Sequence, residues 1–227
     1  MENIFDNREA ASIAAAERIG KALGRRLEAQ GEASVVVSGG SSPAGVFAEL
    51  ARTALAWPDV HVILSDERWV PPNHEDSNEK LVRDTLLTGE ARGATLLPFY
   101  KDGITVEERC GELNDELRLA PFPFACALLG MGEDGHFASL FPDAVKLEDG
   151  LDVDSRELCM PVQTAASPHP RVSLTLSALS RSDEILLLIF GDAKRAVYET
   201  AKKEANGYPV SHLLRQKRAP VHVYWAP

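Results

Sequence analysis

The sequence contains few cysteines, and none of them has the spacing that metal or redox sites use. Only three are present, Cys110, Cys126 and Cys159, and no C-x-x-C pair occurs. An odd number of widely spaced cysteines argues against a disulfide framework and against a zinc knuckle. The same pattern favours a reducing compartment, so we expect a cytoplasmic protein.

The sequence also lacks any apolar run long enough to cross a membrane. The longest uninterrupted runs, 124–129 and 185–190, contain six residues each, whereas a membrane-spanning helix needs about 20. The first six residues, MENIFD, contain neither the basic segment nor the long apolar segment of a signal peptide. We therefore expect no membrane partner.

Basic residues are the minority among the charged ones. The chain has 24 lysines and arginines against 34 acidic residues, a net charge of −10. This balance opposes binding to a polyphosphate backbone, so we expect no nucleic-acid partner. A small anionic substrate would need a local cluster of cations. No repeat, low-complexity tract or linker divides the 227 residues, and we predict a single domain over 1–227 that is a monomer or a weak homodimer.

Apolar periodicity predicts helices that alternate with strands. The helical segments are 7–30, one that starts at Pro43 after the N-cap Ser42, 77–87, 105–117 with a capping box at its start, and one capped by Asp192. The strands are 35–37, 60–64, 124–129, 171–176 with one solvent-facing side, 185–190 and 219–225. This alternation predicts an α/β fold with a mostly parallel sheet and helices on both faces.

The first strand leads into a loop rich in glycine and serine, residues 38–43. A strand, such a loop and a helix start together form an anion-binding arrangement, with the backbone of Gly40, Ser41 and Ser42 available to a ligand. The loop is not a Walker A motif, because no Gly-Lys-Ser/Thr follows it. The alternative interpretation is an ordinary polar turn.

A second glycine-rich turn follows the strand 124–129 and holds one acid and one imidazole. Gly130, Gly132 and Gly135 match the dinucleotide fingerprint G-x-G-x-x-G, but Pro142 comes only seven residues after the last glycine. No long helix can follow for a pyrophosphate to bind, so we expect no cofactor. In open α/β sheets ligands bind at the carboxyl ends of strands, which makes Asp134 and His136 candidate catalytic residues.

Charged residues follow other strands. Asp66 and Arg68 come directly after 60–64 and form either a solvated rim or a ligand-facing cluster. Lys194 falls in the first turn of a helix, where the helix dipole disfavours a cation. It is either placed there for a nearby anion or an ordinary solvated side chain. The triplet 74–76, His-Glu-Asp, is not expected to bind a metal, because adjacent loop residues rarely ligate one ion.

Taken together, these motifs resemble the 6-phosphogluconolactonase family. The most specific block is Asp-Gly-His-x-Ala-Ser-Leu-Phe-Pro at 134–142; SGGSSP at 38–43, SDER at 65–68, RVSLT at 171–175 and G-x-x-K at 191–194 occur in the family's order. The resemblance implies a Rossmann-like fold and hydrolysis of 6-phosphogluconolactone in the pentose phosphate pathway. Two positions depart from the family pattern, Glu133 and Asp143, and neither removes a reactive group.

With this resemblance, we expect His136 to be the general base that activates water, since an imidazole's ordinary pKa near 6.5 suits neutral pH. Asp134 is expected to orient it, hold the turn or bind substrate, and the N–H groups of Gly132 and Gly135 to stabilise the oxyanion. The substrate and its phosphate are expected to contact Gly40, Ser41, Ser42, Asp66, Arg68, Arg171 and Lys194. No metal is expected.

Two alternatives remain open. Glucosamine-6-phosphate deaminases resemble the chain up to the histidine and then continue with Ala-Phe-Asn-Glu-Pro, which supplies a carboxylate for ring opening. The chain instead has Ser139-Leu140-Phe141-Pro142, a difference that favours the lactonase. The non-enzymatic alternative is a sugar-phosphate sensing module that has lost turnover.

Overall fold

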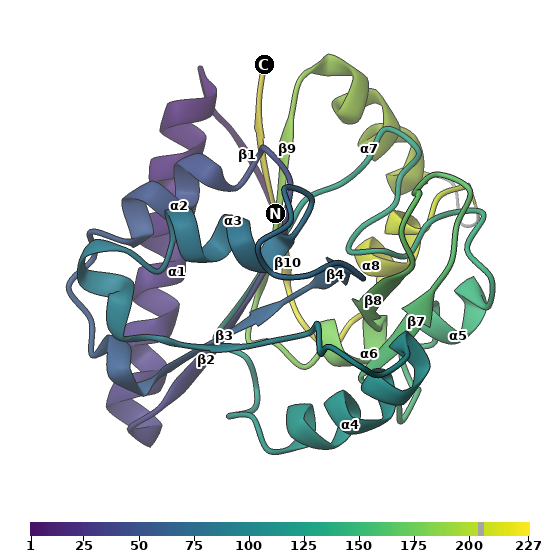
Figure 1. The fold of residues 1–227 in the computed structure, drawn as a ribbon. Coiled ribbons are helices and arrows are strands. Elements are labelled where there is room, and N and C mark those ends of the chain that lie inside the picture. Colours follow the sequence, from purple (N-terminus) through teal and green to yellow (C-terminus); the bar gives the residue numbers. More distant parts are fainter. Residues whose placement is uncertain (204–206) are drawn as a thin grey trace.

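The protein has an α/β fold with one large parallel sheet, as the sequence predicts (Figure 1). The computed structural model describes residues 1–203 and 207–227. All neighbouring strands of the large sheet are parallel. Its strands, in spatial order, are β1 (Glu2–Ile4), β10 (Val221–Ala226), β9 (Ile185–Phe190), β6 (Cys126–Leu129), β2 (Ala33–Val37), β3 (Val60–Leu64) and β5 (Thr95–Leu97).

A second, small antiparallel sheet stands beside the first, and the sequence patterns did not predict it. Its strands are β4 (Asp66–Arg68), β8 (Arg171–Leu174) and β7 (Cys159–Val162). The predicted polar cluster at 65–68 is therefore itself a short strand. Buried apolar residues of both sheets belong to one continuous cluster.

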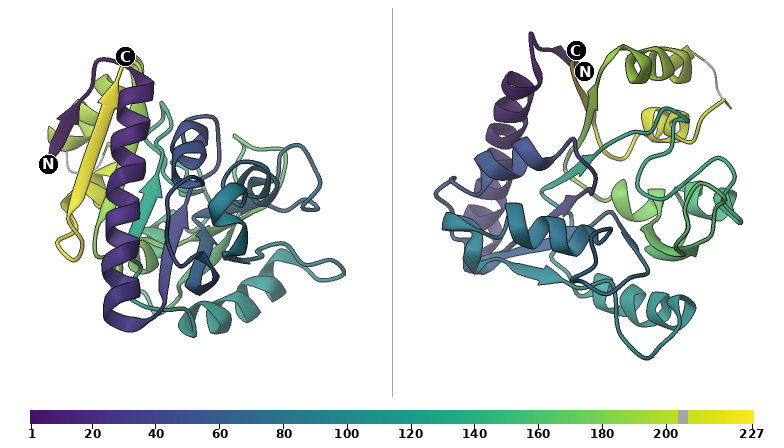
Figure 2. Two further views of the ribbon diagram at one scale, coloured as in Figure 1. Left: turned by 90° about the vertical axis from the view of Figure 1, so that its left-hand side faces the viewer. Right: turned by 45° about the horizontal axis from the view of Figure 1, so that its top comes forward.

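Helices lie on both sides of the large sheet, with α1 and α2 on one side and α7 and α8 on the other (Figure 1). The helices described are α1 (Arg8–Gln30), α2 (Ala44–Leu50), α3 (Asn78–Thr85), α4 (Val106–Arg118), α5 (Leu147–Leu151), α6 (Leu176–Leu179), α7 (Asp192–Lys203) and α8 (Val210–Arg215), with 3₁₀ turns η1 (Trp57–Asp59) and η2 (Gly89–Gly93). Helix α1 runs along the sheet, and β1 and β10, from opposite ends of the chain, lie side by side (Figure 2).

Local sequence signals account for the best-defined helices. The Asn7 side chain accepts a hydrogen bond from the Ala10 N–H at the start of α1, and Gly31 ends the helix with a φ of 79° that favours glycine. The capping box of α4 forms as predicted: the Thr105 hydroxyl and the Glu108 carboxylate each accept a hydrogen bond from the other residue's backbone N–H.

Three local predictions were wrong. Helix α2 begins at Ala44 with Pro43, not Ser42, in the capping position. Helix α7 begins at Asp192 itself, after Gly191, whose φ of 86° favours glycine. The alternating segment at 171–176 has no solvent-facing side along β8, because Ser173 is fully buried against the loop that follows β6.

The chain order explains where a ligand site can form. From β2 the chain proceeds outward to β3 and β5, whereas from β6 it proceeds the other way to β9 and β10. Strands β2 and β6 are neighbours, with Val37 paired to Leu128 near their carboxyl ends. Loops that leave such a switch point flank a crevice. The two glycine-rich loops predicted as functional are the loops that leave these strands.

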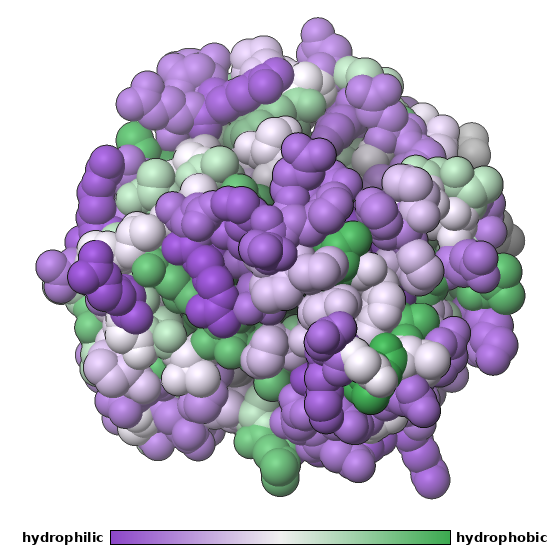
Figure 3. All heavy atoms as spheres, in the orientation of Figure 1, coloured by the Kyte–Doolittle hydropathy of each residue, from purple (hydrophilic) through white to green (hydrophobic). Residues whose placement is uncertain are grey.

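The molecular surface in this view is mainly hydrophilic, and its hydrophobic residues form small separate patches (Figure 3). Within 1–203 and 207–227, no helix combines the length and the apolar character that crossing a bilayer requires.

Candidate functional site

A cavity of about 380 Å³ opens at the switch point of the sheet. It is lined by most of the predicted site residues, which come from five separate segments: Gly40, Ser41, Ser42, Asp66, Arg68, Gly132, His136, Arg171 and Lys194. Asp134 and Gly135 are not among its lining residues. The predicted histidine and the predicted cations therefore share one space.

The turn after β6 holds the histidine in a defined orientation. Nδ1 of His136 lies 2.6 Å from Oδ1 of Asp134, and the same oxygen accepts the His136 backbone N–H at 3.1 Å. On one side the imidazole packs on the Phe141 ring, with centroids 4.1 Å apart. A carboxylate oxygen accepts hydrogen bonds, so the neutral tautomer that fits this contact carries its proton on Nδ1 and leaves the lone pair on Nε2. Asp134 thus orients the imidazole.

The glycines of this turn stabilise its backbone conformation and leave room for the His136–Asp134 pair. The Gly132 N–H donates to the His136 carbonyl at 2.9 Å, and the Gly135 N–H donates to the Gly132 carbonyl at 3.1 Å. Both N–H groups are therefore occupied, which argues against the predicted oxyanion role of Gly132 and Gly135. A Cβ on Gly132 would lie 2.3 Å from His136 Nδ1 and 2.5 Å from Asp134 Oδ1, so only glycine leaves room for this pair.

Three cations face the cavity from three different elements. Arg68, at the end of β4, is held by the Asn78 side chain, whose Oδ1 accepts from its guanidinium at 2.6 Å. Arg171 begins β8 and is mostly buried; its Nε is buried and has no hydrogen-bond partner within the described residues. Lys194 lies in the first turn of α7. Such a cluster can hold an anion although the whole chain is acidic.

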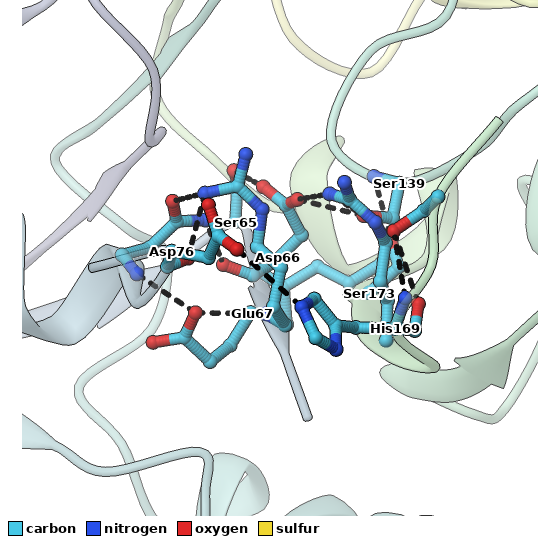
Figure 4. A network of polar contacts seen from close by, with 12 residues as sticks. Ser65, Asp66, Glu67, Asp76, Ser139, His169 and Ser173 are labelled. Carbon is cyan, nitrogen blue, oxygen red and sulfur yellow. Dashed lines mark hydrogen bonds and ion pairs between the residues drawn. The ribbon is translucent and has the colours of Figure 1, made fainter. Parts of the chain in front are cut away.

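Asp66 connects the cations to the turn that contains the histidine (Figure 4). Its carboxylate accepts from the Ser65 and Ser139 hydroxyls, each at 2.7 Å, and Nη1 of Arg171 lies 3.5 Å away. Burial lowers the pKa of Arg171, and the charge of Asp66 opposes that shift. These internal partners fit a positioning role for Asp66, while its place in the cavity lining leaves the predicted contact with substrate a prediction.

A buried carboxylate also supports the loop that holds Arg68. Glu67 accepts from the backbone N–H groups of Arg68, Asn78 and Glu79 at 2.7, 2.8 and 2.7 Å and from the Ser77 hydroxyl at 3.0 Å. Burial nevertheless raises the pKa of Glu67, because the lost hydration outweighs these donors.

The loop after β2 is packed tightly against the same segment. A Cβ on Gly39 would lie 1.8 Å from Oδ1 of Asn78, so the glycine is required for the Asn78 side chain to reach Arg68. Gly40 has a φ of 86°, which favours glycine as well. The first glycine-rich loop and the segment that follows β4 are thus fitted to each other.

The sequence patterns missed Asn78, Ser139 and Ser173 as parts of the site. Ser173 accepts the Ser139 backbone N–H at 3.1 Å, across 34 positions of the chain. Ser139 and Ser173 each stand in a block that resembles the family, at 134–142 and 171–175, and this was the available signal. Asn78 follows a helix-capping serine and carries no signal of its own.

A further group, which we call the rim, consists of His74, Asp76 and His169; it adjoins the cavity through Asp76, whose carbonyl accepts a hydrogen bond from the cavity-lining Arg68 at 3.0 Å. The structure brings His169, from the loop before β8, beside the 74–76 segment, where Nε2 of His169 lies 3.4 Å from Asp76 Oδ2 (Figure 4). The sequence offered no reason to join His169 to His74 and Asp76.

The fold and the cavity define an α/β protein with a polar pocket at the switch point of a parallel sheet. The family model described as "Glucosamine-6-phosphate isomerases/6-phosphogluconolactonase" matches residues 6–225, and the chain belongs to this family.

Curated and solved relatives agree with the family match. The chain is 41% identical to a 6-phosphogluconolactonase of Caulobacter vibrioides over 98% of this chain and 95% of that one. It is 37% identical to a 6-phosphogluconolactonase of Mesorhizobium japonicum over 99% and 94% of the two chains. The crystal structure of a 6-phosphogluconolactonase from Shewanella baltica superposes with a TM-score of 0.95 at 35% identity and covers 100% of this chain and 97% of that one.

Proposed function

We propose that the protein hydrolyses 6-phospho-D-glucono-1,5-lactone to 6-phosphogluconate, a step of the pentose phosphate pathway. The observation that carries the proposal is the shared cavity, which is lined by the imidazole of His136 and by Arg68, Arg171 and Lys194. The substrate carries an activated ester, which the imidazole can attack through water, and a phosphate, which the three cations can bind. The names of the full-length relatives support the same reaction.

His136 acts as the general base. Its Nε2 takes a proton from water while the resulting hydroxide forms a bond to the lactone carbonyl carbon. The bond from that carbon to the ring oxygen then breaks, and the imidazolium returns the proton to the departing oxygen. Asp134 keeps the proton of the neutral ring on Nδ1 and stabilises the imidazolium. No covalent enzyme intermediate is required, because a lactone is already activated.

The phosphate occupies the other end of the cavity. Gly40, Ser41 and Ser42 line the cavity together with Arg68 and Lys194, which is why we assign the phosphate to this group. Arg171 also lines the cavity, and its Nη1 donates to the Ser139 hydroxyl at 3.3 Å. An arginine pairs with a phosphate through two parallel hydrogen bonds, which adds orientation to charge. Arg68→Ala should therefore raise KM for the phosphorylated lactone far more than for gluconolactone without phosphate. Equal effects on both would contradict the phosphate assignment.

The direct test of the activity is a pH-stat assay with freshly made lactone, corrected for spontaneous opening in a blank. We expect acid release well above the blank, and a rate no greater than the blank would favour the sensing module. A deaminase would release ammonia from glucosamine 6-phosphate. Among the described residues that line the cavity, Asp66 is the only carboxylate, and its internal partners favour the lactonase.

We also infer that residues 1–227 act as one domain, a monomer or a weak homodimer, on a small-molecule substrate. The continuous buried cluster shared by both sheets supports one domain. A single cooperative unfolding transition, seen alike by far-UV circular dichroism and tryptophan fluorescence, is the expected outcome.

A further inference from the structure

Two histidines and one aspartate converge beside the cavity-lining Arg68, and the proposed reaction does not use their side chains. His74 and Asp76 lie between β4 and α3, and His169 lies before β8. Oδ2 of Asp76 lies 3.4 Å from His169 Nε2 and 3.8 Å from His74 Nδ1. One ligand atom from each residue lies within 4.8 Å of the other two.

We propose that His74, Asp76 and His169 bind a divalent cation of the zinc type and so join the two loops at the rim. Zinc binds imidazole nitrogen and carboxylate oxygen at about 2.0–2.2 Å, which puts neighbouring ligand atoms of a tetrahedral site roughly 3.4 Å apart. The Asp76–His169 distance already has this value, the Asp76–His74 distance is 3.8 Å, and all three ligand atoms lie within 4.8 Å of one another. Small rotations of these partly exposed side chains would bring the ligand atoms to the tetrahedral spacing. Magnesium should bind this site less well than zinc, because magnesium prefers oxygen ligands and two of the three side chains offer nitrogen.

The surroundings set the expected strength of the site. The Asp76 backbone N–H donates to Nδ1 of His74 at 3.1 Å, so a metal bound to that nitrogen would replace this hydrogen bond. A guanidinium nitrogen of Arg68 donates to the Asp76 carbonyl at 3.0 Å, and this nearby positive charge opposes a second cation. The three side chains are partly exposed, with 39%, 52% and 30% of their surfaces accessible. We therefore expect micromolar affinity, weaker than a buried structural zinc site.

The site has a consequence for the cavity. Asp76 and Arg68 are joined by the hydrogen bond above, and His169 lies two residues before Arg171 on the way into β8. A bound cation would fix both segments that carry these two arginines. We expect it to stabilise the folded protein, since it binds the assembled loops and not the separated ones.

The experiment uses the metal-free full-length chain and does not depend on lactonase activity. Zinc binding is measured by competition with a chromogenic chelator, and thermal unfolding is followed with and without zinc and with magnesium as a comparison. We expect one zinc per chain at the rim and a rise in Tm with zinc but not with magnesium. Zinc binding should weaken at least about tenfold in His169→Ala and in His74→Ala. His61→Ala is the matched control, because His61 is 39% exposed like His74 and lies away from the rim.

A second variant distinguishes zinc binding at the rim from zinc binding at His136 and Asp134, which also offer a nitrogen and an oxygen ligand. In His136→Ala the rim site should bind zinc with unchanged affinity. Asp76→Asn, which keeps the backbone interactions of that residue, should lose binding even if a histidine variant fails to fold. Loss of zinc binding in His136→Ala together with wild-type binding in His169→Ala and Asp76→Asn would overturn the proposal, as would an absence of zinc binding to the wild-type chain.

Discussion

Nδ1 of His136 lies 2.6 Å from Oδ1 of Asp134, two residues earlier in the chain. A tight turn that contains both partners can orient a base without help from distant elements. It requires Gly132, however, because any side chain at that position would enter the space of the pair. This local arrangement leads to the first two predictions.

Asp134→Asn should decrease kcat by about 10²-fold, because an amide can donate to Nδ1 and favour the tautomer that has its proton on Nε2. KM should change little, since Asp134 does not line the cavity. Steady-state kinetics with the phosphorylated lactone give both constants. A rise in KM with kcat unchanged would mean that Asp134 binds substrate instead.

Gly132→Ala should remove most of the activity and leave the protein folded. The new Cβ would lie within 2.5 Å of both members of the His136–Asp134 pair, so the pair must separate. Gly111→Ala is the matched control: a Cβ there meets nothing within 4 Å, and its site on α4 is far along the chain from the turn. The control should keep its rate and gain about 0.5–1 kcal/mol of stability from better helix propensity. Equal activity in the two variants would contradict the account of the turn.

Gly39→Ala should weaken substrate binding through Asn78. The added Cβ would lie 1.8 Å from Asn78 Oδ1, the atom that holds Arg68. We expect KM for the phosphorylated lactone to rise as in Arg68→Ala, and the double variant to show less than the product of the two effects, since both act on one contact. Fully multiplicative effects would show that Gly39 does not act through Arg68.

Stability should fall in mild acid because of His222, which is 3% exposed and accepts a hydrogen bond from Arg18 at 2.8 Å. Burial lowers the pKa of His222, the charge of Arg18 acts in the same direction, and Glu184 opposes them. The folded state thus resists protonation more than the unfolded state. The stability that depends on neutral His222 is therefore fully present above about pH 6.5 and is lost as the pH falls through and below that value.

Urea denaturation at several pH values measures this effect. His222→Gln should flatten the decline of the unfolding free energy between about pH 7 and pH 5, whereas the more exposed His61→Gln should leave it as in the wild type. A wild-type pH dependence in His222→Gln would contradict the assignment.

The sequence predicted those parts of the fold that depend on neighbouring residues. The capping box at Thr105, the end of α1 at Gly31 and the buried strand at 185–190 are local, and each is confirmed. The placement of two glycine-rich loops at strand ends also followed from local pattern, and parallel pairing of β2 with β6 brought them together.

What the sequence did not predict depends on pairing between distant segments. Of the strands of the second sheet only β8 was predicted, from the alternation at 171–176; β4 and β7, with three and four residues, are too short for a periodic signal. Ser173 belongs to β8 and is polar, yet it is buried because it accepts the backbone N–H of Ser139. Ser139 and Arg171, which contact Asp66, and Asp76, which contacts His169, likewise come from segments far along the chain. Such contacts are determined by tertiary packing and leave no local trace.

The most direct test of the central claim, that the imidazole of His136 activates water, is the lactonase kcat of His136→Ala measured against the spontaneous rate. The account predicts a decrease of about 10²–10⁴-fold, with KM for the phosphorylated lactone nearly unchanged because the arginines and Lys194 remain. A kcat within a few-fold of the wild type would contradict it.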